Sequence, residues 1–205
     1  MARIALELGK GCPSAAWVFC ISNSAAWVAS LGPDAMQEVV FADGVPRMCS
    51  AVNPPGSFKP VDGGFIVNGA WPYSSGCYHS AWGMFGVGSK AADGHFVPGG
   101  NVFLRMSDVT IEDSWHVAGL KATGSNTVVA KDLFVPEHLR VPVELASAHL
   151  PGKKHVGEPS DYFPLLPHLR ATMLGVLVGM AEAVLERVTE GAKTKPIIYT
   201  TYQRA

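Results

Sequence analysis

The pattern of hydrophobic and polar residues divides the chain into three stretches. The first stretch is predicted to be helical. Residues 14–31 are rich in Ala, Trp and Val and carry no charge, with Ser14 as candidate N-cap and Gly32-Pro33 as the stop. Such a segment is expected to be a helix buried nearly all round. Asp34 then caps a short amphipathic helix that is expected to end near Phe41.

Short β-prone runs separated by Gly, Pro, Asn and Asp fill the second stretch, residues 48–136. Asp62-Gly63-Gly64 is expected to form a tight turn between two strands, and Pro98-Gly99-Gly100 to precede another strand. The texture is typical of an antiparallel sandwich or barrel. The predicted strands cover residues 57–61, 65–68, 102–106 and 127–135.

The third stretch is predicted to be a linker followed by a long helix. Pro136 and Pro142 mark the linker, and residues 151–158 read as a surface loop. From Leu166, between Pro164 and Pro167, onward, apolar residues recur every three or four positions and predict a long helix with a core-facing stripe. The stripe comprises Leu166, Leu169, Met173, Val176, Leu177, Met180, Val184 and Val188.

A second stripe on the same predicted helix consists of small residues. Ala171, Gly175, Gly179 and Ala183 repeat every fourth residue, which lets another helix backbone approach closely. Two interpretations remain open, packing within the chain and an interface between subunits.

Composition narrows the possible partners. Of 205 residues, 48% are hydrophobic and only 16% are charged, where about 25% is usual, and the net charge is −1. Without a basic surplus, a nucleic-acid-binding surface is disfavoured. The excess of apolar residues predicts large buried surfaces and an oligomer.

The cysteines and the apolar runs indicate a soluble, cytoplasmic protein without a metal site. Cys12, Cys20, Cys49 and Cys77 form no Cys-x-x-Cys pair, so they are expected to be reduced and mostly buried. No export signal is visible, and the longest apolar run, residues 173–181, is half of the ~20 residues that a membrane-spanning helix needs. No membrane partner is expected.

The common catalytic motifs are absent from the sequence. It contains no Gly-x-Ser-x-Gly, Walker loop, His-Glu-x-x-His or EF-hand pattern. Residues 86–91 fit Gly-x-Gly-x-x-Ala, but Asp93-Gly94 follows at once and leaves no room for a phosphate-binding helix. We therefore reject a dinucleotide-binding fingerprint there.

Two segments carry candidate chemistry. Residues 71–82 place Ser74, Ser75 and Gly76 between aromatic residues, which suits a flat ligand with polar ring edges, although an ordinary β-turn with core aromatics explains the pattern as well. Residues 115–125 end in Thr-Gly-Ser, a possible anion-binding nest or a plain connection into the next strand.

The titratable residues nearby give weaker signals. His79 and His116 are acid-base candidates, but a lone His beside apolar residues is more often structural. Glu112-Asp113 has no clustered His or further carboxylate and reads as a solvated loop.

Taken together, residues 64–82, 113–125 and 128–142 resemble a known family. They are similar to the two-component flavin-dependent monooxygenases built on the acyl-CoA dehydrogenase fold, of the p-hydroxyphenylacetate hydroxylase oxygenase type. The resemblance extends over about residues 14–200, and the two motifs in this order are more specific than either alone.

The resemblance implies an α+β fold with a middle antiparallel β-barrel between partial helical domains. Residues 1–44 would end an N-terminal helical domain, 45–142 would form the barrel, and 143–205 would hold the linker and the start of a helix bundle that assembles homotetramers. Because relatives extend beyond both ends, the chain is expected to be a fragment.

The resemblance also implies an activity. A separate flavin reductase would supply reduced FMN or FAD, which reacts with O₂ to a flavin hydroperoxide that hydroxylates a small aromatic substrate. Ser75 would lie near flavin N5 as the catalytic residue, and Trp71 and Ser74 would flank the ring. Trp115 and Ser125 would contact the flavin, with Thr123 assisting.

One departure from the family and two alternatives remain. Where many relatives have a His before the Trp of the buried helix, this chain has Ala25-Ala26-Trp27, so a substrate-activating base is not visible. The first alternative is an acyl-CoA dehydrogenase, which would bind FAD and use a Glu base from the bundle. The second is a non-catalytic, truncated remnant.

Overall fold

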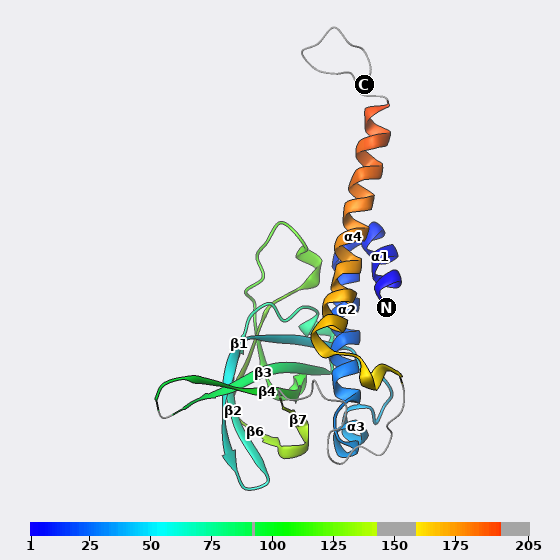
Figure 1. Cartoon of the computed structure of the whole chain (residues 1–205). Helices are drawn as coiled ribbons and strands as arrows, with labels where there is room; N and C mark the ends of the chain where they lie inside the picture. The colour runs from blue at the N-terminus through cyan, green and yellow to red at the C-terminus, as the bar shows by residue number, and fades with distance from the viewer. Residues whose placement is uncertain (92, 143–158, 194–205) are drawn as a thin grey trace.

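The computed structural model describes residues 1–91, 93–142 and 159–193. Helices stand together on one side of the molecule, and a twisted sheet lies on the other (Figure 1). The helices are α1 (Ala2–Gly11), α2 (Pro13–Ser30), α3 (Asp34–Val40) and α4 (Leu165–Ala192). The strands are β1 (Met48–Val61), β2 (Gly64–Trp71), β3 (Trp82–Lys90), β4 (Phe96–Arg105), β5 (Thr110–Glu112), β6 (Thr127–Pro136) and β7 (Arg140–Val141).

Helix α2 forms the inner wall of the helical layer, as the sequence predicts. Its N-cap is Cys12 rather than Ser14, two residues earlier than expected, because Pro13 occupies the first turn, where its missing N–H costs nothing. Only Ala15 of its residues is exposed. The short helix α3 from Asp34 is also confirmed.

The sheet is mostly antiparallel and it is open, so the expected closed barrel needs correction. The strand order is β5-β6-β2-β1-β3-β4-β7, and β1 pairs with β3 in parallel. In the described ranges β5 pairs only with β6 and β7 only with β4, which leaves two edges. With three and two residues, these edge strands are too short to close a barrel.

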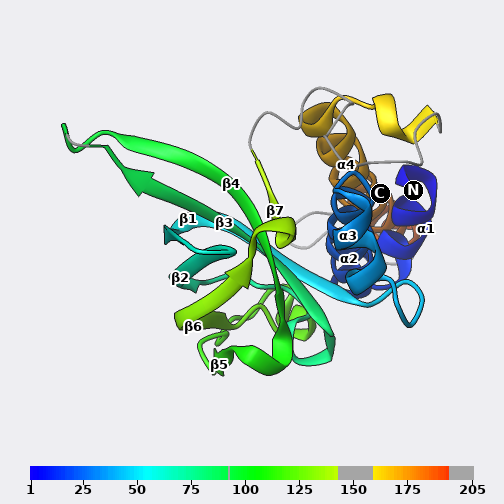
Figure 2. The same ribbon diagram turned by 90° about the horizontal axis from the view of Figure 1, so that it is seen from below.

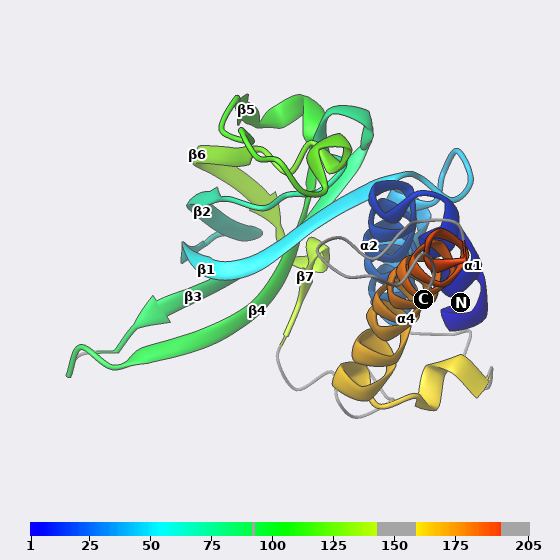
Figure 3. The ribbon, with the colours of Figure 1, turned by 90° about the horizontal axis from the view of Figure 1, so that it is seen from above.

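One predicted turn is confirmed and one predicted strand start is wrong. Val61 pairs with Gly64 across a tight turn in which Gly63 has a φ of 75°. Strand β4, in contrast, begins at Phe96 and includes Pro98-Gly99-Gly100. A register shift opposite Val87 and a φ of 94° at Gly100 absorb these residues as a bulge, so the strand continues through them. The β3–β4 hairpin extends away from the rest of the sheet (Figures 2 and 3).

The two glycines of the small-residue stripe of α4 pack within the chain, against the unpredicted helix α1, whereas Ala171 is exposed. A Cβ added to Gly175 would lie 2.4 Å from the carbonyl oxygen of Ala2, and one added to Gly179 would lie 2.1 Å from that of Leu6. Lys10 of α1 also pairs with Glu182 of α4 at 2.8 Å. The two helices therefore touch backbone to backbone.

The predicted core stripe of α4 is only partly correct. Val176 is fully buried and Met173 and Met180 pack around it, but four of the predicted members are exposed. Val184 and Val188 lie on the second half of α4, which extends beyond the other described elements (Figure 1), whereas Leu166 and Leu177 are exposed on its first half. These exposed residues are Leu166, Leu177, Val184 and Val188.

The main core lies between α2, α3 and the sheet. Trp71 is fully buried there, stacked on Phe85 with a centroid distance of 4.7 Å, and its Nε1 donates to the carbonyl of Gly86 at 2.9 Å. Residues 86–90 form part of β3, which agrees with the rejection of a dinucleotide-binding fingerprint.

The cysteines are free thiols and mostly buried, as expected. Cys20, Cys49 and Cys77 are buried, and Cys12 is exposed. Burial raises the pKa of the Cys49 thiol to about 12. No helix in the described ranges is long and apolar enough to cross a membrane.

The proposed domain limits stay a prediction. Helices α1 to α3 fall in 1–44, all seven strands in 45–142, and α4 in 143–205. The predicted loop at 151–158 lies outside the described residues.

Candidate functional site

The two segments with candidate chemistry lie side by side in the structure. One follows β2 and the other connects β5 to β6. Their backbones are joined by hydrogen bonds from Ser74 N to the Asn126 carbonyl at 3.2 Å and from Gly76 N to the Thr123 carbonyl at 2.8 Å. The pairing brings three hydroxyl-bearing side chains together under helix α2.

These side chains form a continuous chain of hydrogen bonds. Trp17 Nε1 donates to Ser75 Oγ at 3.1 Å, and Ser75 Oγ lies 2.7 Å from Ser125 Oγ. Ser125 Oγ lies 2.6 Å from Thr123 Oγ1, which donates to the Leu120 carbonyl at 2.8 Å. The three hydroxyl residues are at most 4% exposed.

The two ends of the chain set its direction. An indole N–H can only donate and a carbonyl oxygen can only accept, while each hydroxyl has one hydrogen and two lone pairs. Since Thr123 gives its hydrogen to Leu120, Ser125 donates to Thr123. The Ser75 hydroxyl then donates to Ser125 at 2.7 Å, which is a much shorter contact than the 3.5 Å to the Tyr73 carbonyl. Ser75 Oγ keeps one lone pair free to accept from a ligand.

A cavity of about 260 Å³ adjoins this chain of hydroxyls. Helix α2 contributes one wall, and the two loops contribute the others. The lining residues are Trp17, Ile21, Tyr73, Ser75, Trp115, Leu120, Thr123 and Ser125.

Backbone strain marks the rim of the cavity. Tyr73 and Leu120 have backbone φ values of 61° and 54°, a conformation that residues other than Gly rarely adopt. The ring of Tyr73 is exposed and meets Trp115 edge to face at a centroid distance of 5.9 Å. Strain of this kind is retained where the surrounding contacts enforce it, often at functional sites.

Four of the six residues expected at the flavin line the cavity, and two do not. Ser75, Trp115, Thr123 and Ser125 face it together. Trp71 is buried in the core and does not line the cavity. Ser74 is also absent from the lining, and its Oγ donates to the Trp71 carbonyl at 2.9 Å. Their predicted position beside the ring stays a prediction.

The titratable candidates lie outside this cavity. His79 is exposed at a different cavity of about 270 Å³ that also includes Cys12 and Ser14. His116 is exposed and 3.9 Å from Asp113. Within the described ranges, no three His, Cys, Asp or Glu side chains cluster as metal ligands.

Several cavity residues escaped the sequence analysis. Trp17 and Ile21 belong to a helix that reads only as buried, and Trp17 meets Ser75 across 58 positions of sequence. Tyr73 and Leu120 lay within the singled-out segments but carried no separate signal. The proximity of Trp17 to Ser75 arises only from packing.

Comparison with known proteins shows which class of protein the chain is similar to. No family model matches the chain. The fold aligns with XiaF from Streptomyces, solved in complex with FADH2, at a TM-score of 0.87 and 32% identity, covering 100% of this chain and 52% of that one. XiaF and the other solved structures of similar fold are acyl-CoA dehydrogenase-like flavin monooxygenases.

Individual relatives agree with that class. The chain is 39% identical over 147 residues to the flavin-dependent monooxygenase oxygenase subunit HsaA of Mycobacterium tuberculosis, covering 71% of this chain and 37% of that protein. It is 30% identical to the FADH(2)-dependent resorcinol hydroxylase oxygenase component of a Rhizobium species, with coverages of 91% and 48%.

These likenesses confirm the resemblance seen in the sequence. The chain is a homologue of flavin-dependent monooxygenase oxygenase subunits, and its curated relatives are oxidoreductases. The chain covers between 37% and 52% of the length of these three relatives.

Proposed function

We propose that this chain forms a reduced-flavin site of a two-component aromatic monooxygenase. Reduced FMN or FAD would come from a separate flavin reductase, and O₂ and a small aromatic molecule would be the co-substrates. The observation that carries the proposal is the directional hydroxyl chain that ends at Ser75 beside an aromatic-walled cavity.

The cavity fits one edge of a flavin ring system. Indole and tyrosine rings supply flat walls, and Ser75 offers an acceptor where a reduced flavin presents a ring N–H. Its volume of about 260 Å³ lies just below the ~300 Å³ at which small-molecule pockets begin, so it suits a ring edge better than a whole dinucleotide.

Reduced flavin, when bound, supplies the electrons that activate O₂ for insertion of one oxygen atom into an aromatic ring. Ser75 accepts a hydrogen bond from the ring N–H and so retains that proton at the ring. Trp17, by donating to Ser75, keeps the free lone pair aimed at the ligand. Ile21 and Leu120 exclude water from this edge.

Trp71 and Ser74 would then support the ring from below. The Ser74 hydroxyl is bonded to the Trp71 carbonyl, and both side chains are fully buried. We place them beneath Ser75 as a rigid base of the site. A homotetramer, as the resemblance implies, completes the proposal.

Anaerobic titration with reduced FMN and reduced FAD, followed by addition of O₂, tests the proposal. The wild-type chain should bind reduced flavin saturably and delay the return of oxidised-flavin absorbance. Ser75→Ala should shorten that delay by about tenfold, the effect of losing one strong hydrogen bond to a reacting group. Ser57→Ala, an exposed hydroxyl on β1, should leave it unchanged.

Reoxidation that is indistinguishable from free flavin in the wild-type chain would contradict the proposal. It would favour the non-catalytic alternative. A normal delay in Ser75→Ala would instead overturn the role of Ser75 alone.

A further inference from the structure

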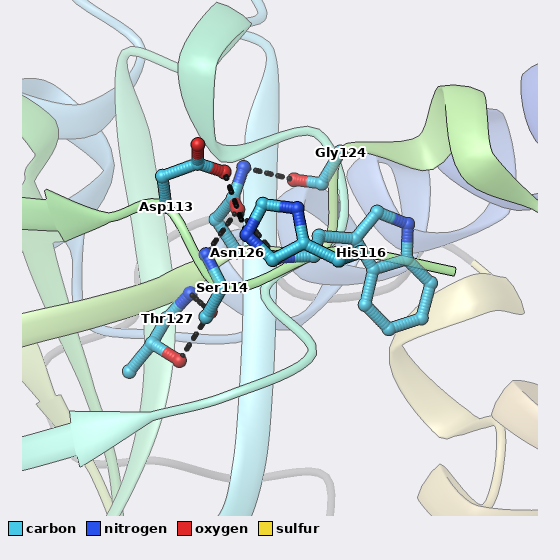
Figure 4. A network of polar contacts seen from close by, with 7 residues as sticks. Asp113, Ser114, His116, Gly124, Asn126 and Thr127 are labelled. Atoms are coloured by element: carbon cyan, nitrogen blue, oxygen red, sulfur yellow. Dashed lines mark hydrogen bonds and ion pairs between the residues drawn. The ribbon is translucent and has the colours of Figure 1, made fainter.

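Asn126 closes the cavity-forming loop at its base. The side chain is 3% exposed, and its Oδ1 accepts the backbone N–H groups of Ser114 at 2.9 Å and Trp115 at 3.0 Å (Figure 4). Its Nδ2 points to the Gly124 carbonyl at 3.4 Å. The amide oxygen thus uses both of its lone pairs on two successive residues.

These bonds begin where the sheet stops holding the loop. The β5–β6 pairing ends with Glu112 opposite Thr127. Beyond that pair, Ser114 Oγ accepts from Thr127 N at 2.9 Å on the exposed side, and Asn126 holds the buried side. The Asn126 side chain therefore supplies hydrogen bonds to the loop where the pairing of β5 with β6 ends.

The same residue ties the loop to the neighbouring segment. The backbone carbonyl of Asn126 accepts from Ser74 N at 3.2 Å, one residue before Ser75. Trp115, Thr123 and Ser125 lie on the loop that Asn126 closes, and all three line the cavity. One residue thus sets where the loop stands relative to Ser75.

We propose that Asn126 is a positioning residue for the monooxygenase reaction, acting through Trp115 and the Ser75–Ser125–Thr123 hydroxyls without itself contacting the flavin. This inference rests on the proposed function. It requires an acceptor with two lone pairs at this position, because an apolar side chain of similar size leaves two N–H groups without a partner.

Three variants separate positioning from general stability. Asn126→Leu removes the acceptor. Asn126→Asp retains it for both N–H groups, but it places an oxygen opposite the Gly124 carbonyl and a carboxyl group at a buried position. Asn68→Leu is the matched control. Asn68 Oδ1 likewise accepts a backbone N–H, that of Asp132 at 2.8 Å, but between β2 and β6 and outside the cavity lining.

Hydrogen exchange at the Ser114 and Trp115 amides is the first measurement, since it needs no flavin. Exchange should become about tenfold faster or more in Asn126→Leu and stay near wild type in Asn126→Asp and Asn68→Leu. Unchanged exchange in Asn126→Leu would overturn the proposal. If Asn126→Leu does not fold, wild-type exchange and delay in Asn126→Asp support the proposal, and their loss overturns it.

The second measurement is the reoxidation delay with reduced FMN and reduced FAD. Asn126→Leu should shorten the delay about tenfold with a smaller change in flavin Kd, and Asn126→Asp should restore it. A wild-type delay despite fast exchange would overturn the positioning role. If the wild-type chain shows no delay at all, the proposed function fails and the catalytic part of this inference with it, while amide exchange still decides whether Asn126 fixes the loop.

Discussion

At the residue scale, the direction of the hydrogen bonds around Ser75 decides what the site offers a ligand. Trp17 lies at the donor-only end and Leu120 at the acceptor-only end, so the Ser75 hydrogen is committed to Ser125. The free group at the cavity is a lone pair. Ligands that present an N–H are therefore favoured over those that present only carbonyl oxygens.

Trp17→Phe is expected to loosen this arrangement. Without the indole donor, the Ser75 hydroxyl can rotate, and the reoxidation delay with reduced flavin should shorten severalfold. Trp82→Phe is the comparison, because Trp82 lies on β3 and outside the cavity lining. Equal effects of the two variants would argue against a specific role for the Trp17 donor.

His168 is expected to make stability depend on pH. Its ring packs on Trp27 at 4.3 Å and on Phe163 at 5.2 Å, and burial lowers its pKa from 6.5. The folded state therefore prefers the neutral ring. Stability from this group is present above pH 6.5 and is lost as pH falls through the folded-state pKa. Urea midpoints between about pH 7.5 and 5 should fall in the wild type and fall less in His168→Phe.

At the element scale, the contact between α1 and α4 depends on the absence of side chains. Gly175 and Gly179 face the carbonyls of Ala2 and Leu6, so the backbones meet without an intervening Cβ. The small residues of α4 predicted that another helix packs closely against it, but not which helix. Helix α1 is amphipathic, with Ala5 and Gly9 buried, but its pattern does not say which helix it packs against.

Gly179→Ala is expected to destabilise the fold although Ala favours helices. The new Cβ would lie 2.1 Å from a backbone oxygen, and overpacking of this kind costs about 1–3 kcal/mol. Gly11→Ala has nothing within 4 Å of the new atom and should be neutral or stabilising by up to ~1 kcal/mol. Thermal unfolding of the two variants measures the difference, and a stabilised Gly179→Ala would contradict the close packing.

At the scale of the whole molecule, α4 presents an apolar surface that the other described elements do not cover. Leu177, Leu185 and Val188 are 53%, 66% and 63% exposed, more than a monomer commonly leaves on one helix. The proposed tetramer would bury such a surface. The low charge of the chain supports the same conclusion.

Leu185→Glu is expected to shift the chain toward smaller assemblies. Light scattering should give the wild type a mass well above 21.7 kDa and give this variant a lower one, since a charge would be buried at the interface. Val45→Glu, at a side chain that is 78% exposed between α3 and β1, should leave the mass unchanged. A monomeric wild type would refute the tetramer.

Local patterns predicted much of the fold. Helix α2, the turn at Gly63 and the long helix α4 follow from periodicity and turn chemistry, which depend on neighbours a few residues away. The motifs around Ser75 and Ser125 indicated the class through resemblance, and comparison confirmed it. The open sheet was missed because it depends on pairing between strands far apart in the sequence, and the bulge at Gly100 because it depends on the register between β3 and β4.

By itself, the amino-acid sequence predicted most of the helical and extended segments, though not α1 or β3, and singled out the two segments that we propose carry the chemistry. Only the tertiary structure decided that Trp17 donates to Ser75, that Asn126 closes the loop, and that α1 covers the glycines of α4. The physical reason is range. Turn and helix preferences act within a few residues, whereas a hydrogen bond between residues 58 positions apart exists only once the core has packed.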